Sequence, residues 1–336
     1  MKTEYSFKSS ELENQLKQFS SKGITELILH DSAISGDKKR LLHFLKTVEQ
    51  DSPELFVSFT VDARVLDNEI CAQCRRLNCS IDIPFVAQEK SDSKLNFFFD
   101  KKFYAKRAVM LNNAGLVFGI NLFFANLRED SFRAFKERLD FSVAQYPNHI
   151  NFPQIEDSKI AKTVQNSSTF NSEDIRRAKN IAFSCKTFYS AGRAVTWFNS
   201  VIKALRITPS EFFSDFAEWQ HCCNCDMASG FVPEDASHHE IEKMQLTFLQ
   251  EKFEEKKKSH LILAVNDIVC MNGALSRLVS DGIESVLETE YNPEDIFGLE
   301  SMDIESFVNN LCQEHCTVKI FTNENGEPDF KILENL

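Results

Sequence analysis

Apolar residues in the first half of the chain recur with two alternating spacings. Short runs of consecutive apolar residues predict strands, and longer segments with apolar residues at every third or fourth position predict helices. The predicted strands begin near residues 25, 55, 80, 116 and 149. Between them, helices are predicted over residues 38–48, 67–76, 103–113 and 129–145. Strands and helices that alternate in this way form βαβ units with a parallel sheet.

The second half of the chain has a mainly helical pattern. After a polar connector at residues 165–169, apolar residues return at helical spacing through most of residues 172–271. Near the end, two apolar stretches flank Asn325 and Gly326, a pair that is typical of a hairpin turn. We therefore expect two domains, a partial (β/α) barrel over residues 1–160 and a mainly helical domain over residues 161–336 with a hairpin near 317–333.

The fold class that follows is α/β. The pattern predicts an incomplete, open parallel (β/α) barrel of about five strands, followed by a helical domain with a small C-terminal β-hairpin. An open barrel leaves edge strands with unpaired backbone groups, and proteins cover or pair such edges. We therefore expect a protein partner, or a second copy of the chain in a homo-oligomer, to cover the open barrel edge.

Composition and charge exclude several classes of protein. Only 10 of the 336 residues are Gly, and neither G-x-G-x-x-G nor G-x-x-x-x-G-K-[ST] occurs, so Rossmann and P-loop nucleotide sites are not expected. The 50 acidic residues outnumber the 38 basic ones, which argues against a nucleic-acid partner. We find no apolar stretch suited to a membrane and no signal peptide. We expect a cytoplasmic protein whose 10 Cys stay reduced.

Polar side chains follow the predicted strands at the edge where barrels carry their sites. The candidate ligand-binding residues at this rim are Asp31, Asp62, Arg64, Asn121, Asn151 and Gln154. Asp62 and Arg64 are two positions apart, so they face the same side of an extended strand. Together they offer the charges that bind a zwitterion or a carboxylate. The alternative for this pair is a surface ion pair with hydrogen bonds to the loop.

The densest group of soft metal ligands is His221, Cys222, Cys223 and Cys225. Zinc binds thiolate and imidazole, and iron–sulfur clusters bind thiolates. The group lies where a predicted helix passes into a loop, so the backbone can wrap around an ion. However, adjacent cysteines diverge and no second C-x-x-C pair lies at the spacing of a zinc site. Structural thiols are therefore the alternative to a metal site.

Cys71, Cys74 and Cys79 form a second group of thiols. The first two have C-x-x-C spacing on a predicted helix. Redox C-x-x-C pairs lie at a helix N-terminus, where the helix dipole lowers the thiol pKa. With Asp67 as the N-cap, this pair falls in the middle of its helix instead. We expect these thiols to face the core.

Several stretches resemble the barrel of the radical S-adenosylmethionine superfamily. Residues 23–31 and 37–42 resemble the second strand and helix of such barrels, and residues 56–67 resemble the third strand and its loop. Residues 103–122 resemble the helix, Gly and strand that follow. The helical residues 167–219 are similar to members that carry an N-terminal cobalamin-binding domain. The resemblance implies a six-stranded barrel of which the first strand is missing here.

The same resemblance implies S-adenosylmethionine and a four-iron cluster as cofactors. In that family a C-x-x-x-C-x-x-C loop holds the cluster, but in this sequence the nearest match, Cys312 and Cys316, has Lys319 where the third thiol belongs. We therefore expect a degenerate relative without a cofactor that acts as a binding or accessory subunit and does no radical chemistry of its own. The alternative is an enzyme that binds zinc, an iron–sulfur cluster or S-adenosylmethionine at the rim or at residues 221–225.

Overall fold

The protein is described by a computed structural model for residues 11, 14–16, 18–19, 22–29, 31–85, 88–89, 97–126 and 130–333. The chain divides into two compact units. Unit 1 consists of Met1–Phe123 with Gln145–Pro153, and unit 2 consists of Phe124–Ala144 with Gln154–Leu336. Helix α6, Phe132–Val143, thus belongs to unit 2, although the strands before and after it in the sequence belong to unit 1.

Unit 1 contains a parallel five-stranded sheet in the order β1-β2-β3-β6-β7. Its strands are β1 (Glu26–Leu29), β2 (Phe56–Thr60), β3 (Cys79–Phe85), β6 (Val117–Leu122) and β7 (His149–Asn151). In the described part of the chain, β1 and β7 are each paired on one side only, so the sheet is open. A short antiparallel pair, β4 (Gln88–Glu89) and β5 (Phe97–Phe98), follows β3 in the sequence. The predicted open parallel sheet is confirmed.

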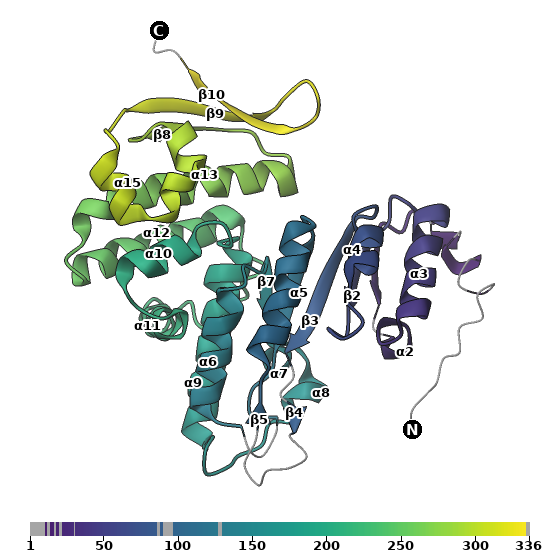
Figure 1. Ribbon diagram of the computed structural model, residues 1–336. Helices are drawn as coiled ribbons and strands as arrows, with labels where there is room; N and C mark the ends of the chain where they lie inside the picture. Colours follow the sequence, from purple (N-terminus) through teal and green to yellow (C-terminus); the bar gives the residue numbers. More distant parts are fainter. Residues whose placement is uncertain are drawn as a thin grey trace. The chain divides into compact units, whose positions relative to one another are not determined.

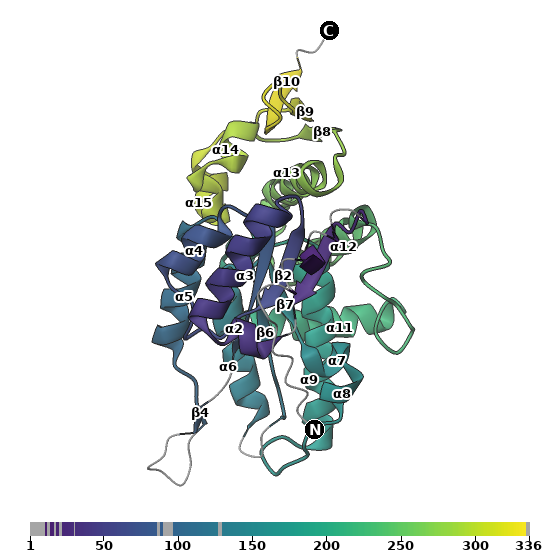
Figure 2. The ribbon, with the colours of Figure 1, turned by 90° about the vertical axis from the view of Figure 1, so that its right-hand side faces the viewer.

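The helices of unit 1 begin at aspartate caps. They are α2 (Ser32–Ser35), α3 (Lys38–Asp51), α4 (Asn68–Cys74) and α5 (Lys101–Asn113). In each, the preceding Asp side chain accepts a hydrogen bond from a backbone N–H of the first turn. Such a cap satisfies donors that have no partner within the helix. Figure 2 shows α3, α4 and α5 on the same side of the strands.

The two faces of this sheet differ in polarity. Apolar side chains that point to one face are buried, among them Val57, Phe59, Ile81, Ile83, Ile120 and Ile150. Polar, half-buried side chains point to the other face, namely Ser58, Thr60, Asp82, Asn121, His149 and Asn151. Parallel strands covered by apolar layers on both faces carry almost continuous apolar runs. The alternation found here gives unit 1 a polar sheet face.

Unit 2 is mainly helical, as expected for the second half of the chain. Its longer helices are α6, α9 (Ser172–Cys185), α10 (Phe198–Leu205), α11 (Pro209–Cys222), α12 (His238–Glu255) and α13 (Ile262–Asp281). Shorter segments are α7 (Pro153–Glu156), α8 (Ser158–Ala161), a π-helix at Lys186–Ala191 and a 3-10 turn at Ser259–Leu261. The Phe188 ring lies 4.8 Å from Phe212 and 4.9 Å from Phe216, in edge-to-face contacts. These rings are fully buried and form the core of the helical region.

The C-terminal part of unit 2 is an antiparallel sheet in the order β10-β9-β8 (Figure 1, yellow and light green). Its strands are β8 (Ser285–Thr289), β9 (Cys316–Thr322) and β10 (Pro328–Leu333). The helical segments between β8 and β9 are α14 (Pro293–Phe297), a 3-10 turn at Leu299–Met302 and α15 (Ile304–Asn310). The predicted hairpin is confirmed as β9 and β10. The third strand, β8, is an addition to the prediction.

The long helix α13 corrects the expectation that no stretch is suited to a membrane. Ser259–Asp281 is long and apolar enough to span one by length and composition, with a mean hydropathy of 1.4. However, 61 % of the apolar window is buried within the protein. Residues of α13 contact α12, α14, β8 and β9. We interpret α13 as the core helix of unit 2.

Candidate functional site

The polar sheet face is organised around Gly119. In the parallel register Asp82 of β3 pairs with Gly119 of β6, and Gly119 pairs with His149 of β7. A Cβ atom on Gly119 would lie 2.1 Å from His149 Nε2 and 2.5 Å from Asp82 Oδ1. Because Gly119 has no side chain, His149 Nε2 and Asp82 Oδ1 meet above it at 2.7 Å.

Further polar contacts lie two residues along the strands from Gly119 and His149. Asn121 of β6 pairs in register with Asn151 of β7. The Asn151 amide Nδ2 donates to Asn121 Oδ1 at 2.9 Å and to Asp82 Oδ2 at 3.1 Å. Both oxygens of Asp82 therefore have donors. The four side chains, Asp82, Asn121, His149 and Asn151, form one hydrogen-bonded group, which we call the polar row.

The polar row leaves groups available for a ligand. A carboxylate only accepts hydrogen bonds, so Nε2 of a neutral His149 ring carries the hydrogen that points to Asp82. The other ring nitrogen, Nδ1, then has a lone pair. His149 and Asp82 keep 27 % and 24 % of their side-chain surface exposed. The row can therefore accept a hydrogen bond at Nδ1 and hold a positive charge near Asp82.

A cavity of about 710 Å³ adjoins this face at the carboxyl ends of β2 and β3. Thr60 and Pro84, which line it, belong to the same sheet face as the polar row. The other lining residues include Asp62, Arg64 and the aromatic side chain of Phe103. Ligands of open α/β sheets bind outside the carboxyl ends of the strands, which is where this cavity lies.

Asp62 and Arg64 contact each other at the mouth of this cavity. The Arg64 guanidinium Nε lies 3.0 Å from both carboxylate oxygens of Asp62. The hydrogen bond from Arg64 holds the pKa of Asp62 below its usual value. Arg64 keeps 76 % of its side-chain surface exposed, so this is an ion pair in contact with solvent. Such a pair contributes little to stability, and its partners can be exchanged for those of a ligand.

The two remaining predicted rim residues, Asp31 and Gln154, do not line this cavity. Asp31 caps α2, where its side chain accepts a hydrogen bond from the Ala33 N–H at 2.8 Å. Gln154 belongs to unit 2 and is buried, with 1 % of its surface exposed. Its Nε2 donates to Phe124 O at 2.8 Å, and its Oε1 has no hydrogen-bond partner among the described residues.

The structure adds residues that the sequence analysis did not single out. Asp82 and His149 lie inside predicted strands, and Gly119 separates them in space. Their signal is present in the sequence as polar residues at alternate positions of β3 and β7. Asn121 and Asn151, which were candidates, are hydrogen-bonded to each other within this group.

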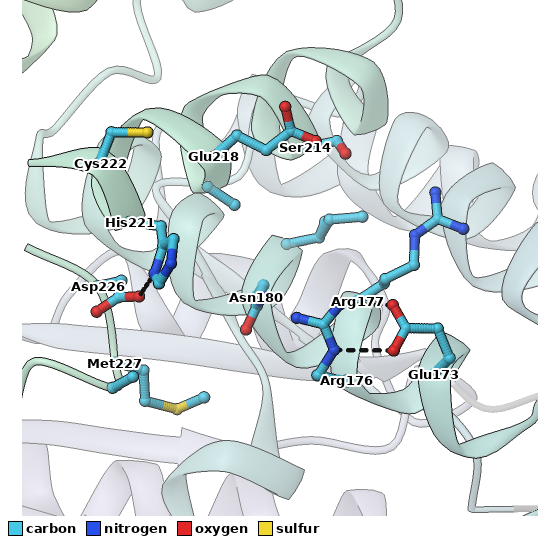
Figure 3. A pocket seen from close by; sticks show the side chains of 13 residues that line it. Glu173, Arg176, Arg177, Asn180, Ser214, Glu218, His221, Cys222, Asp226 and Met227 are labelled. Carbon is cyan, nitrogen blue, oxygen red and sulfur yellow. Dashed lines mark hydrogen bonds and ion pairs between the residues drawn. The ribbon is translucent and has the colours of Figure 1, made fainter. Parts of the chain in front are cut away.

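Two of the four predicted metal ligands, His221 and Cys222, line a separate cavity of about 900 Å³ in unit 2, between α9 and α11 (Figure 3). His221 Nδ1 lies 2.7 Å from Asp226 Oδ2, and Cys222 also lines the cavity. Cys223 is exposed, whereas Cys225 is half-buried, and its burial raises the thiol pKa to about 11. Among the residues that the structure describes, no three His, Cys, Asp or Glu side chains gather as a metal would need. The metal site stays a prediction.

The chain has little similarity to known proteins. No protein-family model matches the chain, and no curated protein matches it. Two solved structures of the radical S-adenosylmethionine methyltransferase TsrM from Kitasatospora setae are similar, one with tryptophan substrate and an S-adenosylmethionine analog, the other with cobalamin and a [4Fe-4S] cluster. Both are 10 % identical over 43 % of this chain, with TM-scores of 0.37 and 0.36. The chain spans 30 % and 28 % of their lengths.

Proposed function

We propose that the chain is a ligand-binding protein that holds a small zwitterion on the open parallel sheet of unit 1. The zwitterion is an α-amino acid or a compound built on one, such as S-adenosylmethionine. The protein acts as a binding or accessory subunit and does no radical chemistry of its own. The observation that carries this proposal is the hydrogen bond between Asp82 and His149 above Gly119. It lies on the sheet face to which Thr60 and Pro84 belong, and these two residues line the cavity together with Asp62 and Arg64.

The charges at this face complement those of an amino acid. Arg64 presents a planar guanidinium that binds a carboxylate in a bidentate manner. Asp62 and Asp82 offer negative charge to an ammonium or sulfonium group, and His149 Nδ1 accepts a hydrogen bond. When the ligand carboxylate binds Arg64 and the ligand ammonium binds Asp62, two ion pairs replace the exposed pair of Asp62 and Arg64. The cavity volume of about 710 Å³ is within the usual range of small-molecule sites.

S-adenosylmethionine is the first ligand to test. It is a zwitterion with an additional positive charge, and the sequence of the first half resembles barrels that bind it. L-Methionine carries the same amino and carboxylate groups without the sulfonium and the nucleoside. A comparison of the affinities for S-adenosylmethionine and L-methionine therefore separates recognition of the amino and carboxylate groups from recognition of the sulfonium and the nucleoside.

Isothermal titration calorimetry with the full chain tests this proposal. We expect saturable binding of S-adenosylmethionine, weaker saturable binding of L-methionine, and at least about a tenfold loss of affinity in Arg64→Ala and His149→Ala, which corresponds to about 1.4 kcal/mol. The control is Arg133→Ala, because the exposed Arg133 pairs with Glu137 in unit 2. No saturable binding of either compound, or equal affinity in all variants, contradicts the proposal.

The accessory role requires a partner for the open edges of the sheet. Ile28 on the edge strand β1 keeps 55 % of its surface exposed. Backbone groups of an edge strand are available for pairing with another chain. Size-exclusion chromatography with light scattering is expected to show a dimer, or a complex when a partner is co-purified. A monomer that retains no partner at micromolar concentration contradicts the accessory role but not ligand binding.

A further inference from the structure

We propose that Cys74 and Cys79 are a thiol modification site, which a peroxide converts into a disulfide. Cys74 is the last residue of α4 and Cys79 is the first residue of β3. The turn Arg75–Asn78 connects them, so the chain itself brings the end of the helix back to the start of the strand.

The Cys79 side chain contacts Cys74 in the reduced protein. The Cys79 thiol donates a hydrogen bond to Cys74 O at 3.5 Å. Both residues are buried, with 0 % of Cys74 and 7 % of Cys79 exposed. Two neighbouring cysteines that are shielded from solvent favour a bond within the protein over one to a second molecule.

Access to this pair is through Cys79. A cavity of about 620 Å³ lies at the amino end of the sheet, and Cys79 lines it together with Arg75 and Asn78. Cys74 does not line this cavity. A small oxidant such as hydrogen peroxide therefore reaches the sulfur of Cys79 first, and the sulfur of Cys74 lies behind it.

The pKa directions of the two thiols also indicate that Cys79 reacts before Cys74. The hydrogen bond from the Cys74 thiol holds the pKa of Cys79 below its ordinary value. The same hydrogen bond, together with burial, raises the pKa of Cys74. The thiolate is the reactive form of cysteine. Cys79 is thus the attacking sulfur and Cys74 is the resolving sulfur.

The reaction has two steps. The Cys79 thiolate attacks hydrogen peroxide, the O–O bond breaks, and a sulfenic acid and hydroxide form. The Cys74 sulfur then attacks the sulfenic sulfur, and the S–O bond breaks. The hydroxide that leaves takes the proton of the Cys74 thiol, so a disulfide and a water molecule form. In sum, two thiols and one peroxide give one disulfide and two waters.

This assignment differs from the one that the C-x-x-C spacing suggests. Cys71 and Cys74 are three residues apart within α4. Burial raises the pKa of Cys71 to about 11. Cys79, by contrast, contacts Cys74 directly, since its thiol donates to Cys74 O. The thiol partner of Cys74 is therefore Cys79, across the turn.

Peptide mass spectrometry after treatment of the full chain with hydrogen peroxide tests the proposal. Remaining thiols are blocked with N-ethylmaleimide before digestion. We expect a cross-link between Cys74 and Cys79 that disappears on reduction with dithiothreitol. The exposed Cys222, Cys223 and Cys312 serve as internal evidence that the oxidant was active.

Two variants separate this proposal from other pairings. Cys74→Ser removes the resolving thiol, and we expect Cys79 to stop at a sulfenic acid that dimedone labels. Cys71→Ser keeps both thiols of the proposed pair, and we expect the cross-link to form as in the unmodified chain. A cross-link between Cys71 and Cys74, or an unmodified Cys79 when Cys222 is oxidised, would overturn the proposal.

Discussion

Asp82 Oδ1 and His149 Nε2 lie 2.7 Å apart, although strand β6 separates the two strands that carry them. Strands two places apart in a sheet are separated by about 10 Å, which two side chains span only when nothing stands between them. Gly119 of β6 leaves that space open. The contact therefore depends on three strands in register, and it fixes the orientation of the His149 ring.

The substitution Gly119→Ala tests this dependence. Its Cβ would meet His149 Nε2 at 2.1 Å, so the His149 ring and the Asp82 carboxylate must move apart. We expect a loss of about 1–3 kcal/mol in the free energy of unfolding, measured by urea denaturation, and a loss of zwitterion binding.

The matched control is Val117→Ile, which adds a methylene to the same strand at a position that is 44 % exposed. We expect little change in either measurement. Equal stability and affinity in Gly119→Ala and Val117→Ile would show that Gly119 does not hold the polar row open.

A buried ion pair in unit 2 gives a prediction for stability. Asp130, with 1 % of its surface exposed, accepts hydrogen bonds from Arg138 at 3.0 and 2.9 Å and from the Ala125 N–H at 2.9 Å. Arg138→Met leaves the Asp130 carboxylate buried without its cation. We expect a loss of about 3–5 kcal/mol in urea denaturation.

The exposed pair of Arg133 and Glu137 lies on the same helix and serves as the comparison. Arg133→Met should change the free energy of unfolding by about 0–1 kcal/mol. A similar cost for both substitutions would mean that burial of the Asp130–Arg138 pair has no energetic consequence.

Asp267 gives the stability of the chain a pH dependence. Burial raises its pKa to about 7, although its Oδ2 accepts the Glu290 N–H at 2.7 Å and the Tyr291 N–H at 3.0 Å. In the unfolded chain an Asp loses its proton near pH 4. Between pH 4 and pH 7 the Asp267 carboxyl therefore holds its proton in the folded chain but not in the unfolded chain. This proton stabilises the folded chain fully below pH 4, and the stabilisation is lost as the pH rises through about 7.

Asp267→Asn removes this titration and keeps an oxygen for the two N–H donors. The urea concentration at the midpoint of unfolding is measured at about pH 5 and pH 8. We expect it to decrease less between these two pH values in the variant than in the unmodified chain. Parallel changes in both proteins would assign the pH dependence to other groups.

The sequence predicts the five strands of the parallel sheet because each one is a short segment that lies between helical segments. It does not predict the short pair β4 and β5. It does not predict the polar row. Asp82 and His149 are 67 positions apart, and only the strand register brings them together. Gln154 shows the opposite case, since it lies only three positions after the end of β7 in unit 1 but is itself a buried residue of unit 2.

The Asp62–Arg64 contact was accessible to prediction because the two residues are close in the sequence. The predicted extended strand is wrong here, because β2 ends at Thr60 and Asp62 begins a turn in which its carbonyl accepts the Val65 N–H at 2.8 Å and its carboxylate accepts the Arg64 N–H at 2.9 Å. The strand β8 was not, because its alternation is short and its pairing with β9 joins residues about 30 positions apart, such as Glu288 and Thr317. Local spacing thus predicts local contacts, whereas the long-range contacts of the site require the paired sheet.

Long-range ¹H–¹⁵N NMR of the histidine rings is the most direct test of the account, with His149→Gln for assignment. We expect His149 to carry its hydrogen on Nε2 in the free protein and its Nδ1 resonance to shift on addition of S-adenosylmethionine. The resonances of the exposed His221 and His315 should stay unchanged. A His149 ring with its hydrogen on Nδ1, or one that does not respond to saturating S-adenosylmethionine, would contradict the proposed binding face.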